Sequence, residues 1–165
     1  MDLSAKRRQQ MVLGAFYGDA FSLGPHWIYD VEQIRNQFGV IETMTAPLEG
    51  SYHSGKKAGD FTHYGDQSLI LLQSVSERRG FSLEDYKKKW LELFDDYSGY
   101  IDGATRKTLA NVAAGKSDPI GSPSNDLAGA GKIAPLIYCN QELDAVLAAV
   151  QEQVAMTHNS DLVID

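Results

Sequence analysis

The sequence predicts an all-helical protein, and two observations carry that prediction. Apolar residues recur three and four positions apart over most of the chain, most clearly between residues 143 and 154. Residues that commonly cap helices stand just before such runs, among them Ser4, Ser82 and Asp102. Both patterns favour a fold made of helices packed on one another.

The first predicted helix covers residues 4–20 and the second covers residues 31–38. Gly14 and Gly18 fall on one face of the first helix, where we expect a neighbouring backbone or a ligand to approach closely. Residues 40–65 show no sustained period. Long loops of this kind inside compact domains are usually functional or disordered.

Three further helices are predicted in the middle of the chain. The third covers residues 67–79, the fourth follows the Ser82 cap, and the fifth runs from the Asp102 cap to Gly115. The fourth helix places a row of aromatic and apolar residues along one face between residues 86 and 97. Leu109 and Val112 of the fifth helix are expected to point to the core.

Residues 126–138 are expected to form one helix of small residues that Pro135 kinks or ends. Asn140 is predicted to cap the next helix, and residues 160–161 to cap a last one whose apolar residues 162–164 stay unburied. We infer one domain, 1–165, that is either an incomplete version of a larger fold or completes its core through a partner chain, including a second copy of itself.

Composition excludes several classes of function. The chain has 165 residues, of which 43% are hydrophobic, so it can bury a real core. A formal net charge of −7 argues against a general nucleic-acid surface. The single cysteine, Cys139, cannot form an internal disulfide, and residues 11–16 are too short an apolar run to cross a membrane. We therefore expect a soluble, cytoplasmic protein.

The most informative segment is a polar loop, residues 59–68, that leads into the apolar run 69–72. Asp66, Gln67 and Ser68 are predicted on the first turn of a helix, where unpaired backbone N–H groups favour anions. The alternative is that Asp66 is only a helix cap.

Five segments resemble, in matching order, motifs of the ADP-ribosylglycohydrolase family. They are residues 14–20 (GAFYGDA), 59–72 (GDFTHYGDQSLILL), 103–105 (GAT), 130–136 (AGKIAPL) and 157–158 (TH). The resemblance implies a compact, orthogonal, all-α fold of which this chain is about the N-terminal half. It also implies a two-metal magnesium site that binds ADP-ribose and cleaves its glycosidic bond to a modified protein or small molecule.

The chain departs from the family pattern at the metal site. Family members usually carry Thr-Asp-Asp-Thr where this chain has Gly65-Asp66-Gln67-Ser68. The metal ligands carried over are therefore Asp66 and Gln67, of which Gln67 supplies an oxygen but no charge. The family's second acidic cluster would lie beyond Asp165. The residues 24–30, GPHWIYD, resemble a divergent branch of the family.

The candidate catalytic residues are Asp66, Asp60 and His63, which lie in or next to the same polar loop. Asp66 is assigned as a metal or substrate ligand, and Asp60 and His63 as acid/base groups or ligands. A histidine in a loop is more often simply solvated, and this alternative stays open for His63.

His26 and Trp27 are predicted to form a stacking and hydrogen-bonding wall for an adenine or ribose, with Gly65 and Ser68 as further substrate-binding residues. Core packing is the alternative for Trp27. His158, at a helix end, is expected to carry a positive charge that interacts with the helix dipole.

Three hypotheses follow. In the first, a bound Mg²⁺ positions a water that cuts the glycosidic bond of an ADP-ribosylated substrate. In the second, the protein binds ADP-ribose or has a structural role without catalysis, as some lens crystallins that resemble this family do. In the third, an unrelated helical module binds a partner protein through the aromatic face of residues 86–97.

Overall fold

The protein is described by a computed structural model that covers residues 4–164. Its helices are α1 (Ala5–Ser22), α2 (Val31–Phe38), α3 (His63–Arg78), α4 (Leu83–Asp95), α5 (Gly103–Ala113), the 3₁₀ helix η1 (Leu127–Lys132), α6 (Ala134–Cys139), α7 (Leu143–Ala155) and α8 (Asp161–Ile164). Within that range there is no strand, and the one isolated β-bridge joins Ser122 to His158. The all-helical prediction is confirmed.

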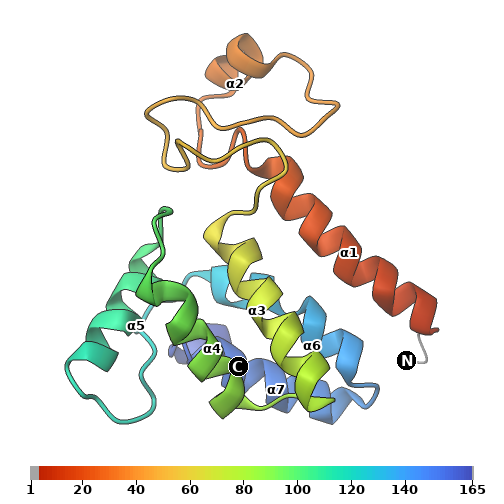
Figure 1. Cartoon of the computed structure of the whole chain (residues 1–165), viewed down its shortest axis with the longest axis vertical. Helices are drawn as coiled ribbons and strands as arrows, with labels where there is room; N and C mark the ends of the chain where they lie inside the picture. Colours follow the sequence, from red (N-terminus) through yellow and green to blue (C-terminus); the bar gives the residue numbers. More distant parts are fainter. Residues whose placement is uncertain (1–3, 165) are drawn as a thin grey trace.

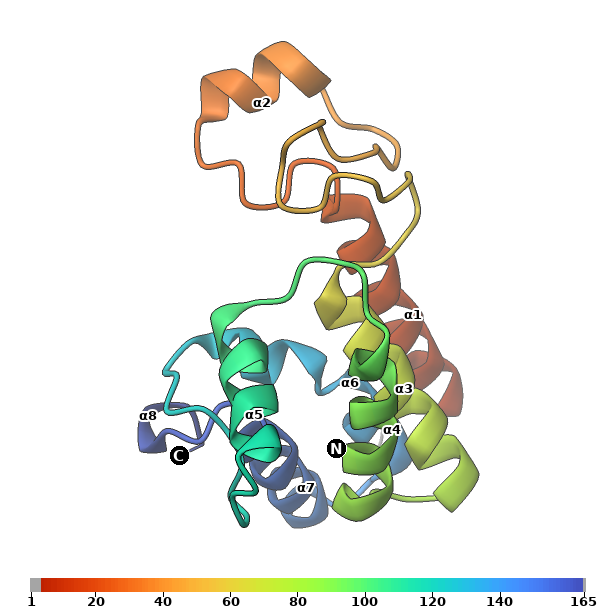
Figure 2. The same ribbon diagram turned by 60° about the vertical axis from the view of Figure 1, so that its left-hand side comes forward.

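Helix α3 is the centre of the helical body and begins earlier than predicted. It packs against α4 on one side and against α6, α1 and η1 on the others (Figures 1 and 2). Its N-cap is Thr62, whose hydroxyl accepts a hydrogen bond from the N–H of Tyr64. The plain-cap interpretation of Asp66 is therefore wrong, because Thr62 already caps the helix and Asp66 lies within its first turn.

The core lies between α3, α4, α6 and α7. Its buried members are Leu71, Val75, Tyr86, Trp90, Ile120, Leu136, Ala149 and Met156. Tyr86 and Trp90 lie on the predicted apolar face of α4, and their burial confirms that face. The apolar period of α7 is only partly a core face, because Val154 is buried whereas Leu143 and Leu147 are 67% and 50% exposed.

Residues 126–138 differ from the prediction of one helix. The chain forms η1 up to Lys132 and then a separate short helix, α6, which carries Pro135 in its first turn. A proline at the start of a helix gives up an N–H that has no partner there anyway, so Pro135 begins α6 rather than ending a longer helix. Asn140 does not cap α7 and instead follows the end of α6, where its N–H donates to the carbonyl of Leu136.

Residues 23–61, here called the distal segment, lie at one end of the molecule beyond the C-terminal end of α1 (Figures 1 and 2). This segment contains α2, which buries no residue, and the long polar loop that the sequence predicted. The distal segment is followed directly by Thr62, the N-cap of α3. The two carboxylate oxygens of Asp19 on α1 accept the N–H and the hydroxyl of Thr62 at 2.8 and 2.6 Å, so the start of α3 is fixed to α1.

The glycine stripe on α1 is not a packing surface within residues 4–164. A Cβ atom added at Gly14 or Gly18 would meet nothing within 4 Å, so the predicted approach of a neighbouring backbone is wrong for the part of the chain described, and the approach of a ligand stays a prediction. Among these residues, no helix has the length and apolar character needed to cross a membrane.

Candidate functional site

Asp66 is held by two long-range partners that sequence inspection did not identify. One of its carboxylate oxygens, Oδ2, lies 3.0 Å from Nζ of Lys56 and accepts a 2.6 Å hydrogen bond from the hydroxyl of Tyr97. The side chains of Lys56 and Asp66 are 19% and 23% exposed, so the ion pair is partly shielded from water. Burial, followed by the hydrogen bond to Asp66, raises the pKa of Tyr97, so its hydroxyl remains a donor.

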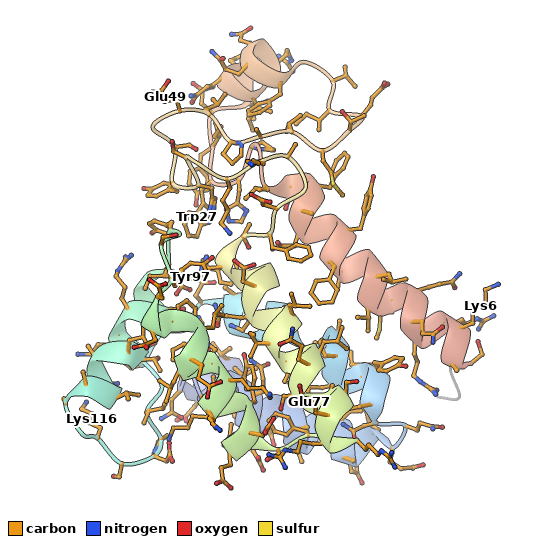
Figure 3. All side chains as sticks on the ribbon, in the orientation of Figure 1. Lys6, Trp27, Glu49, Glu77, Tyr97 and Lys116 are labelled. Carbon is orange, nitrogen blue, oxygen red and sulfur yellow. The ribbon has the colours of Figure 1, made fainter. Side chains whose placement is uncertain are left out.

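A cavity of about 390 Å³ adjoins this pair. Lys56 and Tyr97 lie in its wall together with polar loop residues from two parts of the chain, Ser54, Gly55, Asp96, Ser98 and Gly99. Tyr97 lies where α4 ends beside the start of α5 (Figure 3). A small ligand in this cavity would therefore contact the two groups that hold Asp66.

Gln67, the residue after Asp66, points into the core. It is wholly buried, and its Oε1 accepts a 2.8 Å hydrogen bond from the indole N–H of Trp90. Neighbouring residues on α3 thus have opposite environments: Asp66 faces the cavity side and Gln67 packs beneath it. The amide fits this position because it can accept the indole N–H without bringing a charge into the core.

His63 belongs to a buried polar group at the start of α5. It is wholly buried, and its Nε2 accepts the N–H of Asp102 at 3.3 Å, so the solvated-loop alternative is wrong. The carboxylate of Asp102 accepts hydrogen bonds from the hydroxyl of Tyr64 at 3.0 Å and from the N–H of Thr105 at 2.7 Å. Burial would raise the pKa of Asp102, but its contacts with His63 and Thr105 outweigh burial and hold that pKa below its usual range.

Lys132 is a buried cation behind the same group. It is 1% exposed, and its Nζ lies 5.7 Å from the ring centroid of Tyr64 without a hydrogen-bond partner in residues 4–164. Burial lowers the pKa of Lys132 to about 8, although the charges of Asp102 and Asp126 oppose that change. A lysine in such surroundings can lose its proton near neutral pH.

His158 is not the charged helix-end residue that the sequence suggested. It is wholly buried against Gly129, and burial, followed by the nearby charge of Lys132, lowers its pKa. Its Nδ1 lies 2.9 Å from the hydroxyl of Thr157. A neutral imidazole is therefore favoured, because the loss of hydration and the charge of Lys132 outweigh the opposing charges of Asp102 and Asp126.

The rings of His26 and Trp27 belong to an aromatic cluster between the distal segment and the helical body (Figure 3). Trp27 has a left-handed backbone with φ of 61°, an uncommon conformation for a bulky residue. Its ring contacts both sides of the boundary, lying 5.6 Å from His53, 5.2 Å from Tyr52 and 5.0 Å from Tyr100. The packing of these rings holds the strained residue in place.

His26 and Trp27 also line a cavity of about 510 Å³ under α2, together with polar residues of the long loop such as Glu49 and Ser51. The wall therefore combines aromatic rings with polar groups, a combination that suits a ring-bearing ligand with hydroxyl or amino groups. Both predicted functions of Trp27, packing and wall formation, are compatible with this position.

The remaining predicted site residues have mainly local partners. Asp60 is exposed, and its carboxylate accepts the N–H of Lys57 at 2.7 Å. The hydroxyl of Ser68 donates to the carbonyl of Tyr64 at 2.9 Å. Gly65 is buried against Asp19, where a Cβ would lie 2.3 Å from Oδ2, so its backbone brings α3 close to α1.

Comparison with known proteins establishes the family. A family profile described as ADP-ribosylglycohydrolase matches residues 2–165. The chain belongs to the ADP-ribosylglycohydrolase family. A solved structure titled ADP-ribosylglycohydrolase-related protein complex shares its fold, with a TM-score of 0.76 and 20% sequence identity over 97% of this chain and 52% of that one.

Two relatives of this ADP-ribosylglycohydrolase chain are crystallins of Tripedalia cystophora. Crystallin J1A is 26% identical over 123 residues, which cover 72% of this chain and 37% of the crystallin. Crystallin J1B is 26% identical over 118 residues, which cover 69% of this chain and 36% of the crystallin. The chain thus spans well under half the length of these two relatives and about half that of the structural neighbour.

ADP-ribosylglycohydrolases are typically metal-dependent. Mg²⁺ prefers six oxygen ligands in near-octahedral geometry, with carboxylates among them. Here the charge of Asp66 is matched by Lys56, and the amide oxygen of Gln67 accepts the indole of Trp90. Residues 4–164 contain no group of three or more His, Cys, Asp or Glu side chains arranged to hold a metal ion. The donor set of this part of the chain therefore does not fit Mg²⁺.

Sequence inspection missed Lys56, Tyr97, Tyr64 and Lys132 as members of the site. The partners of Asp66 lie 10 and 31 residues away along the chain, and no spacing rule connects such positions. One signal was available for Lys132, because a lysine inside a run of small, packed residues will be desolvated.

Proposed function

We propose that this chain recognises the ADP-ribose group of a modified substrate and contributes to hydrolysis of the glycosidic bond at its ribose. The family match over residues 2–165 and the shared fold support this proposal. The observation that carries it is the partly shielded Asp66 carboxylate, held by Lys56 and Tyr97 beside a cavity of about 390 Å³.

The proposed chemistry assigns one proton transfer to Asp66. Its Oδ2 accepts hydrogen bonds from Lys56 and Tyr97, whereas Oδ1 accepts no side-chain hydrogen bond within residues 4–164. Oδ1 would accept a proton from a water as that water attacks the anomeric carbon of the ribose. The bond from that carbon to the leaving nitrogen or oxygen breaks as the bond to the water oxygen forms, and the leaving group takes up the proton that Oδ1 accepted.

The cavity of about 510 Å³ beside His26 and Trp27 is proposed to hold another part of the same ligand. The rings of His26 and Trp27 would stack on its base, and the polar loop would bind its hydroxyl groups. Burial lowers the pKa of His26, more than the charge of Asp19 raises it, so the ring offers a neutral surface for stacking.

A second function, binding of ADP-ribose without hydrolysis, is favoured by one specific observation. The Lys56–Asp66 ion pair neutralises the carboxylate that would otherwise activate a water or hold a metal. The similarity to crystallins J1A and J1B agrees with a non-catalytic role of this kind.

The test is calorimetric titration of the purified protein with ADP-ribose, together with an assay for release of ADP-ribose from a modified protein. Binding with release supports the hydrolase, and binding without release supports the second function. The Asp66→Ala variant should abolish release and weaken binding, whereas Asp144→Ala, an exposed acid on α7, should change neither. If the protein neither binds nor releases ADP-ribose, both functions are rejected and only the family fold remains.

A further inference from the structure

We propose that the ammonium group of Lys56 takes the place of a metal cation at Asp66, so that this site acts without a divalent ion. The identity of the ligand in this inference rests on the proposed recognition of ADP-ribose. The central claim about Lys56 does not. It follows from the contacts of three side chains that converge from different parts of the chain.

The first step is the position of the ammonium. Nζ of Lys56 lies 3.0 Å from Oδ2 of Asp66 and 5.6 Å from the ring centroid of Tyr97. The same oxygen accepts the hydroxyl of Tyr97 at 2.6 Å. The cation is therefore held by a carboxylate and an aromatic face at once, in surroundings that keep most of the water away.

The second step is that Lys56 occupies the approach to the carboxylate. It lies in the cavity wall beside Tyr97, and its side chain is 19% exposed. A divalent ion that approached Asp66 from this cavity would meet a like charge already bound to Oδ2. The second family carboxylate is replaced by Gln67, whose oxygen is used in the core. The charge already present at Oδ2 and the amide of Gln67 in place of a second carboxylate are thus unfavourable for a metal. The same surroundings favour the ammonium of Lys56.

The third step is what the ammonium offers a ligand. An ammonium has three N–H donors, and the contact with Asp66 uses one of them. The others can bind an oxygen of the ligand, such as a ribose hydroxyl or a phosphate oxygen in the cavity of about 390 Å³. Lys56 would then orient the ligand against Asp66, the task that a metal performs in other sites.

The test that does not depend on ADP-ribose is thermal unfolding with and without divalent ions. The unfolding midpoint of the wild type should be the same in EDTA and in millimolar Mg²⁺. Lys56→Met should lower the midpoint by about 2–4 °C and make it rise again when Mg²⁺ is added, because Asp66 is then left without a cation. Lys56→Arg, which keeps the charge, should restore insensitivity to Mg²⁺. The neighbouring exposed Lys57→Met is the control and should behave as the wild type.

Two results would overturn the inference. One is a wild-type midpoint that rises with Mg²⁺ and loses this response in Asp66→Asn, since a metal would then bind despite Lys56. The other is a Lys56→Met variant that gains no response to Mg²⁺, since the ammonium would then be an ordinary ion pair and not the occupant of a cation site.

Calorimetry with ADP-ribose separates this inference from the proposed function. The dissociation constant of the wild type should agree within about twofold in EDTA and in Mg²⁺, and Lys56→Met should weaken binding by about tenfold, or ~1.4 kcal/mol. Binding that requires Mg²⁺ would overturn the role of Lys56 while leaving ADP-ribose recognition in place. An absence of ADP-ribose binding in every condition would reject the proposed function, and the unfolding series would still decide the claim about Lys56.

Discussion

The indole N–H of Trp90 donates a 2.8 Å hydrogen bond to Oε1 of Gln67, and both side chains are wholly buried. This contact gives a structural reason for an amide where the family pattern has a carboxylate. A carboxylate at this position would bring a charge into the core between α3 and α4 without a counter-ion.

The first prediction concerns Gln67→Glu, which restores an acidic side chain of the family pattern. We expect it to lower the free energy of unfolding at pH 7 by about 2–4 kcal/mol, because an ionised carboxylate is buried without a positive partner. Urea unfolding measures this change. Gln73→Glu, at an exposed position of the same helix, is the matched control and should change stability by under about 0.5 kcal/mol. Equal stability of the two variants would show that position 67 tolerates charge.

The second prediction concerns the contact between α1 and α3. Gly65→Ala places a Cβ 2.3 Å from Oδ2 of Asp19 and 2.7 Å from Cβ of Phe61, so the helices must move apart. We expect a loss of about 1–3 kcal/mol in the free energy of unfolding. Gly14→Ala, where an added Cβ meets nothing within 4 Å, should instead stabilise α1 by up to about 1 kcal/mol. A Gly65→Ala protein as stable as the wild type would contradict the close packing of the two helices.

The third prediction concerns acid stability and His53. This ring is 2% exposed, neither ring nitrogen has a hydrogen-bond partner within residues 4–164, and burial, followed by the charges of His26, His63 and Lys56, lowers its pKa to about 4. As pH falls from 6.5 to 4, the unfolded chain takes up a proton at this residue and the folded chain does not, so stability falls.

His53→Phe should remove this acid sensitivity and keep the ring contact with Trp27. The stability difference between variant and wild type should grow by about 1–3 kcal/mol between pH 6.5 and pH 4. Chemical unfolding at a series of pH values provides the measurement. Parallel curves for the two proteins would mean that His53 is protonated in the folded state.

The fourth prediction concerns alkaline stability and Lys132. Its pKa in the folded protein is about 8, below the usual value of 10.5, so between these values the unfolded chain holds a proton that the folded chain has lost. The contribution of Lys132 to the free energy of unfolding therefore rises as pH increases from 8 to 10.5, and it is lowest below pH 8.

Lys132→Met fills the same space without a charge. It should be more stable than the wild type at pH 7 by about 2–3 kcal/mol, and this advantage should shrink as pH approaches 10.5. Lys107→Met, at an exposed position of α5, should show no such pH-dependent difference. A constant difference between Lys132→Met and the wild type across this range would show that Lys132 keeps its ordinary pKa.

Much of the fold could be predicted because its signals are local. Ser82 and Asp102 accept hydrogen bonds from N–H groups three residues ahead, so each helix start is encoded within one turn. The start of α3 was missed because Thr62 is followed by polar and aromatic residues that do not show the apolar period. The break at Pro135 was misplaced because a proline is compatible with either end of a helix, and only the packing of α6 decided which one.

The amino-acid sequence alone was enough to specify the helical class, the family and the position of Asp66 in a first helical turn. The partners of Asp66 were decided by tertiary structure, because Lys56 and Tyr97 come from a distant loop and the end of another helix. The same holds for Gln67 and Trp90, which lie 23 residues apart. Helix caps and periods depend on neighbours within a turn, whereas the charge, burial and ligand contacts of a site depend on which segments the folded chain brings together.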